Sequence, residues 1–154
     1  MIKLFAMDVD GTLTDGNINI SEKGEIFKSF NAKDGLGINL LINNNITPVV
    51  ITGRTSKIIN FRMNELGVKY IYQNVQNKLD CLKKICKDMN ISLNEVAYIG
   101  DDINDIEILK NVGYSFCPSD SVIVVKQIVD HVCSLPGGNG AVREAIDILL
   151  EKIK

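Results

Sequence analysis

Two short acidic stretches carry the side chains that are best suited to chemistry. Asp8 and Asp10 stand two residues apart after one apolar run. A second apolar run is followed by Asp101, Asp102 and Asp105. If these runs are adjacent strands of one sheet, as many as five carboxylates gather at a single edge, and their mutual repulsion requires a cation. An all-oxygen ligand set of this kind favours Mg²⁺.

The elements that must position these carboxylates alternate between strand and helix patterns. Short β-rich runs, typical of buried strands, occur at Leu4 to Val9, Thr47 to Thr52, Lys69 to Tyr72, Val96 to Ile99 and Tyr114 to Cys117. Helical patterns lie at Asp34 to Asn43, Ser56 to Leu66, Asn77 to Met89, Asp102 to Asn111, Ser121 to Gln127 and Ala141 to Ile153. Because parallel strands need crossover connections, this alternation predicts an α/β, Rossmann-like fold with a mainly parallel sheet flanked by helices. Ligands bind such sheets at the carboxyl ends of the strands, which is where the aspartates lie.

One segment interrupts the alternation. Residues 17–30 contain two stretches of alternating polarity around a Ser-Glu-Lys-Gly turn, which predicts a small β-hairpin inserted after the first strand. No repeat, low-complexity tract or linker divides the sequence. We therefore expect residues 1–154 to form a single domain.

The composition of the chain limits which kinds of partner it can bind and where in the cell it is expected. The formal net charge is -2 and the Lys and Arg residues are scattered, which argues against nucleic acid and against a membrane surface. No apolar stretch approaches the ~20 residues of a membrane span, and the N-terminus shows no signal-peptide cleavage pattern. We expect a cytoplasmic protein that acts on a small soluble molecule. The four cysteines lack zinc-site spacing and are expected to be buried thiols, and the single histidine, His131, is expected to be structural or exposed.

Four motifs in order resemble those of the haloacid dehalogenase superfamily. They are Asp8-Val9-Asp10-Gly11-Thr12 after the first strand, Thr52 at the end of the second, Lys78 at a helix start, and Gly100-Asp101-Asp102 with Asp105. Each motif alone is a weak indicator of this superfamily, whereas all four in this order are specific to it. The resemblance implies a haloacid dehalogenase-like fold and a Mg²⁺-dependent phosphatase that works through an aspartyl-phosphate.

The resemblance also implies a role for each side chain. Asp8 would attack phosphorus and form the covalent intermediate. Asp10 would donate a proton to the leaving oxygen and later take one from the attacking water. Thr52 would hydrogen-bond a phosphoryl oxygen of the substrate, and Lys78 would neutralise charge on Asp8 and on the transferring group.

By the same resemblance, the metal would be held by Asp8, the backbone carbonyl of Asp10 and Asp101. Asp102 or Asp105 would support it through water or through hydrogen bonds to the ligands. For these last two aspartates, stabilisation of a helix N-terminus is an equal alternative.

Along nearly its whole length the sequence resembles the 3-deoxy-D-manno-octulosonate 8-phosphate phosphatases, which lack a large cap domain. The resemblance implies a homotetramer in which the hairpins form a central barrel and neighbouring subunits help to close each site, and a place in lipopolysaccharide biosynthesis. The segment Gly137 to Gly140 is then either a helix-entry turn or part of a neighbour's active site. The matching stretches are Asp8 to Gly16, Phe30 to Gly35, Ile51 to Arg54, Tyr98 to Asp102 and Gly137 to Glu144.

Substrate recognition would involve Gly53 and Arg54, next to Thr52. Octulosonate carries a carboxylate, and a guanidinium group binds carboxylates in a planar, bidentate way. The related nine-carbon sugar-acid phosphatases typically have Glu after Thr-Gly, so Arg54 favours the eight-carbon substrate. Arg62 and Arg143 are further candidates for substrate binding, and each has a contact with another subunit as its alternative.

Three other functions compete with this interpretation. A phosphatase for a nine-carbon sugar-acid 9-phosphate would use the same chemistry. A signalling or scaffold module that accepts phosphate on Asp8 is disfavoured, because Asp10 would hasten dephosphorylation. A phosphomutase usually needs a mobile cap to retain its intermediate, and the small hairpin argues against one.

Overall fold

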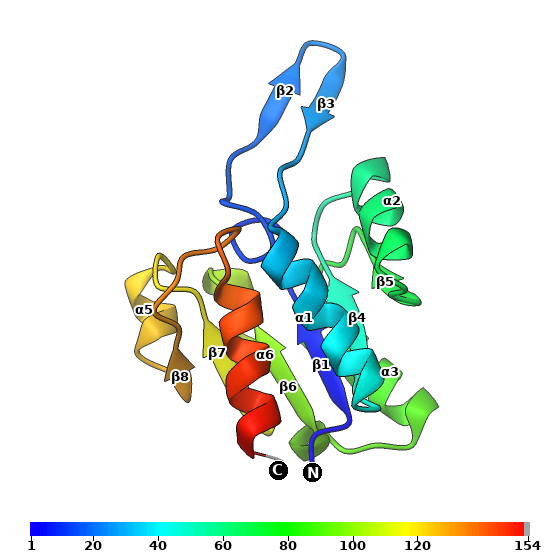
Figure 1. The fold of residues 1–154 in the computed structure, drawn as a ribbon, viewed down its shortest axis with the longest axis vertical. Coiled ribbons are helices and arrows are strands. Elements are labelled where there is room, and N and C mark those ends of the chain that lie inside the picture. Colours follow the sequence, from blue (N-terminus) through cyan, green and yellow to red (C-terminus); the bar gives the residue numbers. More distant parts are fainter. Residues whose placement is uncertain (153–154) are drawn as a thin grey trace.

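The structure, a computed structural model, describes residues 1–152 and contains the predicted parallel sheet (Figure 1). Six strands lie in the order β5-β4-β1-β6-β7-β8, and every neighbouring pair is parallel. The central strand β1 therefore lies between β4 and β6, so the first and fourth predicted strands are adjacent. The strands are β1 (Leu4–Met7), β4 (Thr47–Ile51), β5 (Tyr70–Tyr72), β6 (Val96–Ile99), β7 (Tyr114–Cys117) and β8 (His131–Val132).

Helices cover both faces of the sheet. On one face α1 and α6 pack side by side, and α2 contributes to the same core (Figure 1). The opposite core is formed with α3, α4 and α5. The helices are α1 (Ala32–Asn43), α2 (Lys57–Glu65), α3 (Lys78–Met89), α4 (Ile106–Leu109), α5 (Ile123–Lys126) and α6 (Ala141–Lys152), with 3₁₀ turns η1 (Leu93–Glu95) and η2 (Ile103–Asp105).

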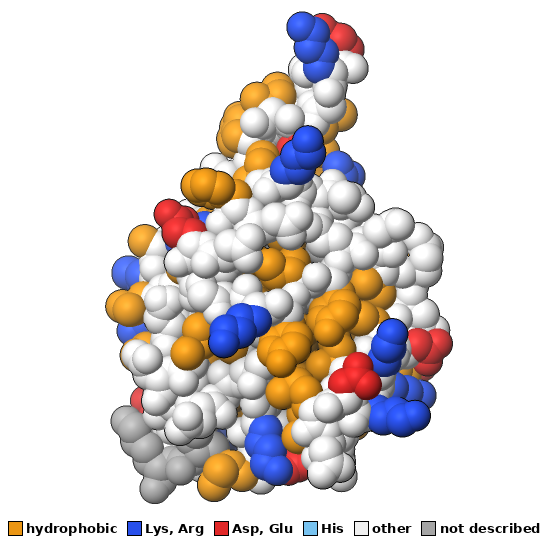
Figure 2. All heavy atoms as spheres, turned by 90° about the vertical axis from the view of Figure 1, so that its right-hand side faces the viewer, with side chains coloured by type: hydrophobic (Ala, Val, Ile, Leu, Met, Phe, Trp, Pro, Cys, Tyr) orange, Lys and Arg blue, Asp and Glu red, His pale blue; other side chains and the backbone are white. Residues whose placement is uncertain are grey.

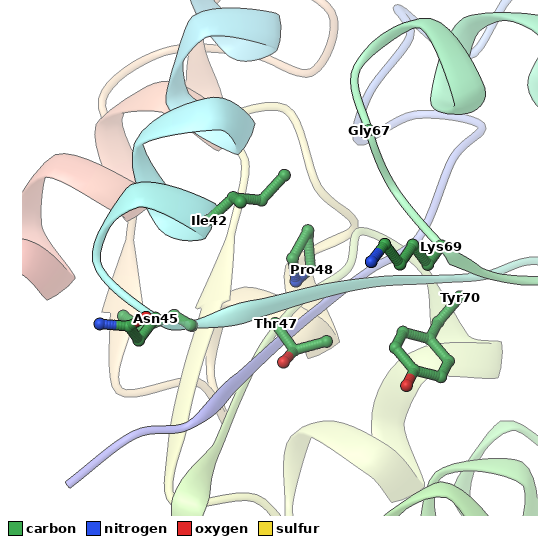
Figure 3. A pocket seen from close by; sticks show the side chains of 8 residues that line it. Ile42, Asn45, Thr47, Pro48, Gly67, Lys69 and Tyr70 are labelled. Atoms are coloured by element: carbon green, nitrogen blue, oxygen red, sulfur yellow. The ribbon is translucent and has the colours of Figure 1, made fainter.

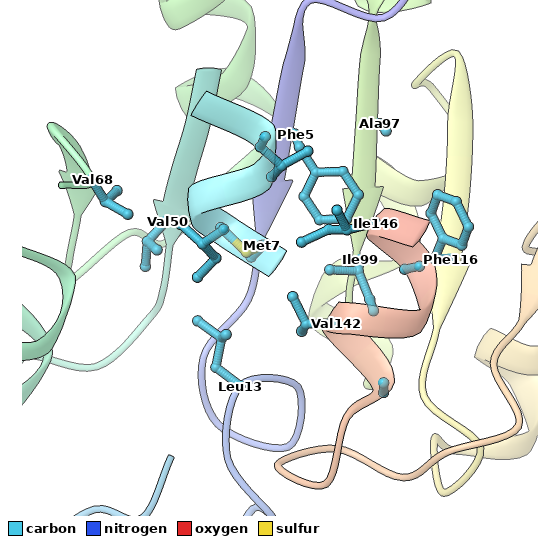
Figure 4. Packing of buried hydrophobic residues seen from close by; sticks show 14 of the residues in the cluster. Phe5, Met7, Leu13, Val50, Val68, Ala97, Ile99, Phe116, Val142 and Ile146 are labelled. Atoms are coloured by element: carbon cyan, nitrogen blue, oxygen red, sulfur yellow. The ribbon is translucent and has the colours of Figure 1, made fainter. Parts of the chain in front are cut away.

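The strands divide their side chains between two hydrophobic cores. In β1, Phe5 and Met7 enter the core under α1 and α6, whereas Leu4 and Ala6 enter the core under α3. Figure 4 shows the first of these cores, where side chains from the sheet meet Ile146 of α6. Because both faces are covered, the strands are continuous apolar runs, which is the pattern from which they were predicted.

The hairpin also forms as predicted. Its strands β2 (Asn19–Ser21) and β3 (Gly24–Phe27) are antiparallel and project away from the carboxyl edge of the sheet (Figure 1). Within residues 1–152 no larger cap covers that edge.

Several predicted elements are shorter than expected. The predicted helix Asp102 to Asn111 is the η2 turn followed by the short α4, because the Asp105 carboxylate accepts backbone N–H groups and tightens the chain there. The predicted helix Ser121 to Gln127 is reduced to α5. The two-residue strand β8 was missed, since two residues show no periodicity. Position 153, the end of the last predicted helix, lies outside the described residues.

The cysteines and the histidine, which were not expected to take part in chemistry, pack against other side chains or lie in the core. Cys86, Cys117 and Cys133 are buried free thiols, and Cys81 is half-buried. The ring of His131 packs edge-on against Phe116, with 5.9 Å between ring centroids. Among residues 1–152, no helix has the length and apolar character needed to cross a bilayer.

The packing of α6 against the sheet predicts a large stability loss for Ile146→Ala. This side chain is fully buried, so its removal leaves a cavity and should lower the free energy of unfolding by about 2–5 kcal/mol. Ile123→Ala is the matched control, because Ile123 is 73% exposed and its loss should change stability by less than about 0.5 kcal/mol. Urea unfolding of both variants measures the difference, and equal losses would contradict the packing.

Candidate active site

Three of the four predicted catalytic residues, Asp8, Asp10 and Thr52, line a hollow of about 200 Å³ at the carboxyl edge of the sheet, and the fourth, Lys78, contacts Asp8. A larger hollow, of about 350 Å³, lies at the opposite edge beside the start of β4 (Figure 3). No carboxylate lines that hollow, and a third one of about 730 Å³ beside α6 contains none of the predicted catalytic residues, so the predicted chemistry belongs to the smallest of these three. The smaller hollow is lined by Asp8, Asp10, Thr52, Gly53, Arg54, Asp101, Asp102 and Asn104.

A tight loop after β1 presents Asp8. The Asp8 N–H donates to the carbonyl of Ile99 on β6, and the Val9 carbonyl accepts three N–H groups from the residues that follow. Gly11 has φ +86°, and a Cβ there would collide with the carboxylate of Asp101. Glycine at this position therefore allows the two acidic loops to touch.

The glycine-rich segment Gly137 to Gly140 packs on this same loop. Gly138 N donates to the Thr12 carbonyl at 3.1 Å, and a Cβ on Gly137 would collide with the Gly11 carbonyl. The segment thus supports the loop after β1 in its own chain and leads into α6.

Lys78 joins the two acidic loops from the first turn of α3. Its Nζ lies 2.8 Å from Asp8 Oδ1 and 2.7 Å from Asp105 Oδ1. Tyr98 on β6 donates its hydroxyl to the same Asp105 oxygen at 2.6 Å. All four side chains are buried, so this lysine has its charge balanced by carboxylates at short range.

The Asp105 carboxylate accepts four hydrogen bonds. Its Oδ1 accepts from Lys78 and Tyr98, while its Oδ2 accepts the N–H groups of Asp101 and Asp102 at 3.0 and 3.3 Å. Its bond from the Asp102 N–H is part of a capping box at the start of η2, so Asp105 stabilises this helical turn, one of the two alternatives that the sequence left open. Its support of a metal site stays a prediction.

The crowded carboxylates strongly influence one another. Burial raises the pKa of Asp8 well above its ordinary value, and the charge of Asp105 adds to this, while Lys78 opposes it. Burial likewise raises the pKa of Asp101 to about 6. Burial alone would lower the pKa of Lys78, but the charges of Asp8 and Asp105 outweigh it and raise that pKa. A further positive charge at this site would keep the two aspartates ionised near neutral pH.

The donor set fits a divalent cation. Oxygens of Asp8, Asp101 and Asp105 lie within 4.8 Å of one another. Carboxylates this close repel one another when ionised, and a cation between them offsets that repulsion. The ligands are all oxygens, which suits Mg²⁺.

Asp10 has a partner that the sequence did not reveal. Lys28, just after β3, donates from Nζ to Asp10 Oδ1 at 2.7 Å and to Glu25 Oε1 at 2.9 Å. On the other side, Arg54 Nε is 3.9 Å from Asp10 Oδ2. A lysine in an exposed hairpin is ordinarily solvated, so no local pattern marked Lys28. Lys28 is identified only by its hydrogen bond to Asp10, a residue 18 positions away in the chain.

Three predicted residues make contacts that the sequence did not specify. Asp102 is exposed at the rim, where its Oδ1 accepts from Ile103 N at 2.7 Å, so it caps the η2 turn. Arg62 and Arg143 do not line the hollow of their own chain. Each pairs with an acidic residue of its own helix, namely Glu65 at 2.8 Å and Asp147 at 2.9 Å.

Comparison with known proteins places these features in a family. Residues 64–146 match the haloacid dehalogenase-like hydrolase family. The 3-deoxy-D-manno-octulosonate 8-phosphate phosphatase of Salmonella typhi is 39% identical over 149 residues, which cover 97% of this chain and 79% of that protein. The enzyme of that name from Haemophilus influenzae is 40% identical over 150 residues, covering 97% and 83%.

Solved structures show the same relationship. A cobalt-bound phosphatase of this name from Haemophilus influenzae superposes with a TM-score of 0.94 at 40% identity, covering 97% of this chain and 88% of that one. The Moraxella catarrhalis enzyme, solved with magnesium, phosphate and a KDO molecule, gives a TM-score of 0.94 at 39% identity, covering 97% and 86%. From its sequence and its fold alike, the chain belongs to the haloacid dehalogenase-like hydrolases and is a phosphoric monoester hydrolase.

Proposed function

We propose that the protein hydrolyses 3-deoxy-D-manno-octulosonate 8-phosphate to the free sugar acid and phosphate, with Mg²⁺ as cofactor. The observation that carries this proposal is the convergence of Asp8 and Asp101 at one hollow that Arg54 also lines, with Lys78 paired to Asp8 behind it. Relatives with this activity in their names match 97% of the chain, which supports the same substrate.

The proposed reaction has two displacements at phosphorus. In the first, a carboxylate oxygen of Asp8 forms a bond to phosphorus while the bond to the sugar oxygen breaks, and Asp10 gives that oxygen a proton. In the second, Asp10 takes a proton from water, whose oxygen bonds to phosphorus as the aspartyl-phosphate bond breaks. Inorganic phosphate leaves, and both aspartates return to their starting states.

The surrounding charges would make both displacements possible. Hydrolysis of phosphate monoesters needs up to ~10²¹-fold acceleration, most of which comes from positioning and electrostatics. Lys78 lies where it can neutralise charge on the transferring group, and the buried Thr52 hydroxyl borders the same space. A bound Mg²⁺, held by Asp8, Asp101 and the Asp10 carbonyl, would offset the charge of the phosphoryl oxygens.

Selection of a sugar acid is assigned to Arg54 and Gly53. Both are exposed at the mouth of the hollow, and the Arg54 side chain is 52% exposed, so its guanidinium is available to a substrate carboxylate. A glutamate there would repel that carboxylate. Nine-carbon sugar acids carry a carboxylate too, so the preference for the eight-carbon substrate rests on the resemblance, since the nine-carbon phosphatases typically have Glu at this position.

We also propose that the protein is a homotetramer built through its hairpins. Ile20, Ile26 and Phe27 are 60%, 58% and 51% exposed on the projecting hairpin, where Figure 2 shows hydrophobic side chains. Large apolar side chains gathered on a narrow projection are typical of a surface that packs against another chain. Arg62 and Arg143, which do not reach their own hollow, would then contact substrate or partner through such an assembly.

Asp8→Asn tests the nucleophile. The amide cannot form the acyl-phosphate, so kcat should fall by at least about three orders of magnitude while the thermal unfolding midpoint stays close to that of the wild type. Asp15→Asn, an exposed aspartate a few residues further on, is the control and should retain activity. Normal turnover by folded Asp8→Asn would refute the assignment.

Metal binding is tested by differential scanning fluorimetry with and without Mg²⁺. The cation relieves repulsion between Asp8 and Asp101, so Mg²⁺ should raise Tm of the chelator-treated wild type. Asp101→Asn removes one ligand and should abolish most of this shift. An equal Mg²⁺ shift in both proteins, or full activity after thorough chelation, would contradict the metal site.

The substrate is tested by turnover of eight- and nine-carbon sugar-acid phosphates together with 4-nitrophenyl phosphate. Arg54→Glu should lower kcat/KM for the eight-carbon substrate by about 10- to 100-fold, the value of one charge-assisted hydrogen bond, with little change for the aryl phosphate. Lys57→Glu makes the same charge change on a residue outside the hollow and is the control. Equal losses on both substrates would remove the specificity role, and preference for a nine-carbon substrate would overturn the substrate assignment.

A further inference from the structure

Lys28 belongs to none of the sequence motifs, yet it contacts the site directly. It lies at the base of the hairpin, one residue after β3, and its side chain is only 4% exposed. Its Nζ is held between Asp10 at 2.7 Å and Glu25 at 2.9 Å. Lys23, at the turn of the same hairpin, is exposed. The hairpin thus directs one of its lysines back toward the catalytic loop.

The charge on Lys28 is held in place by its neighbours. Burial of an ammonium group is costly unless it is paired and hydrogen-bonded. Burial alone would lower the pKa of Lys28, but hydrogen bonds to Asp10 and Glu25 raise that pKa above its ordinary value. Lys28 is therefore a permanently charged donor beside Asp10.

Glu25 ties this lysine to the body of the protein. The Ser56 hydroxyl donates to Glu25 Oε2 and also accepts the Ile59 N–H as the N-cap of α2. Burial works against the charged form of Glu25, yet hydrogen bonds from Ser56 and Lys28 hold its pKa below the ordinary value. The position of Lys28 is thus set by the start of α2 as well as by the hairpin.

The Asp10 carboxyl group has one side-chain hydrogen-bond partner among the described residues, which is Lys28. Among the described residues, no other side chain lies within hydrogen-bond distance of Asp10, since Arg54 is 3.9 Å away. A carboxyl group at a half-open rim has rotational freedom unless something fixes it. To deliver a proton, the Asp10 carboxyl group must lie within hydrogen-bond distance of the leaving oxygen.

We propose that Lys28 is a positioning residue, which holds the Asp10 carboxyl group where it delivers its proton to the leaving oxygen. The inference rests on the proposed two-step phosphatase mechanism and adds a residue to it. Glu25 and Ser56 act behind Lys28, so the hairpin contributes to catalysis within its own chain.

A pair of aryl phosphates isolates this role. Phenolate is a strong base and needs a proton as it leaves, whereas 4-nitrophenolate is a weak base and leaves without one. Neither substrate carries a carboxylate or a sugar, so binding through Arg54 does not enter the comparison. The value of kcat/KM covers the steps up to loss of the leaving group, and later hydrolysis of the aspartyl-phosphate is common to both substrates.

The experiment compares kcat/KM for phenyl and 4-nitrophenyl phosphate in Lys28→Met, Lys28→Arg and the control Lys23→Met. Proton donation contributes about 10²–10⁴-fold, so losing its alignment in Lys28→Met should cost about tenfold or more on phenyl phosphate relative to 4-nitrophenyl phosphate. Lys28→Arg restores a cationic donor and should recover most of the loss. Lys23→Met should leave the ratio unchanged.

Equal losses on both substrates, or no loss, in folded Lys28→Met would overturn the positioning role and leave the proposed function standing. A wild-type protein that hydrolyses neither ester would overturn both. If Lys28→Met does not fold, Glu25→Gln carries the test, because it keeps Lys28 but removes one of its two charged partners. It should shift the ratio in the same direction by a smaller factor, and an unchanged ratio would again overturn the proposal.

Discussion

Repulsion among closely packed carboxylates is the constraint on which this structure depends. Oxygens of Asp8, Asp101 and Asp105 lie within 4.8 Å of one another in a buried site, where like charges interact strongly. Lys78 offsets part of that charge, and a divalent cation would offset more. The positive charges that offset this crowding lie where a phosphoryl group would bind, so the same arrangement serves the proposed chemistry.

The topology satisfies this constraint by placing β1 and β6 side by side at the centre of the sheet. Their carboxyl ends deliver the two acidic loops to one point, and glycines at Gly11 and Gly137 remove the atoms that would hold neighbouring backbones apart. Lys78 arrives from α3 on one face of the sheet. The hairpin has two distinct surfaces: an exposed apolar one that faces away from the chain, and a polar base that reaches Asp10.

In the proposed function, the hollow is open and still selective, because different residues bind the two parts of the substrate. Within one chain, Arg54 is the single predicted arginine that borders the hollow, while Arg62 and Arg143 pair with residues of their own helices. In the proposed function, buried residues bind the phosphoryl group and the exposed rim binds the sugar acid. A tetramer formed through the hairpins would bring additional side chains to that rim without changing the buried machinery.

The fold class and the meeting point of the first two acidic motifs could be predicted from the sequence alone. Continuous apolar runs predict strands covered on both faces, and Asp8, Thr52 and Asp101 follow such runs directly, so their meeting point follows from parallel topology. Only the tertiary structure decided that Asp105 organises hydrogen bonds, that Asp102 caps a turn, and that Lys28 faces Asp10. Those outcomes depend on which side chain reaches which partner across loops, and local periodicity contains no information about contacts between residues distant in the chain.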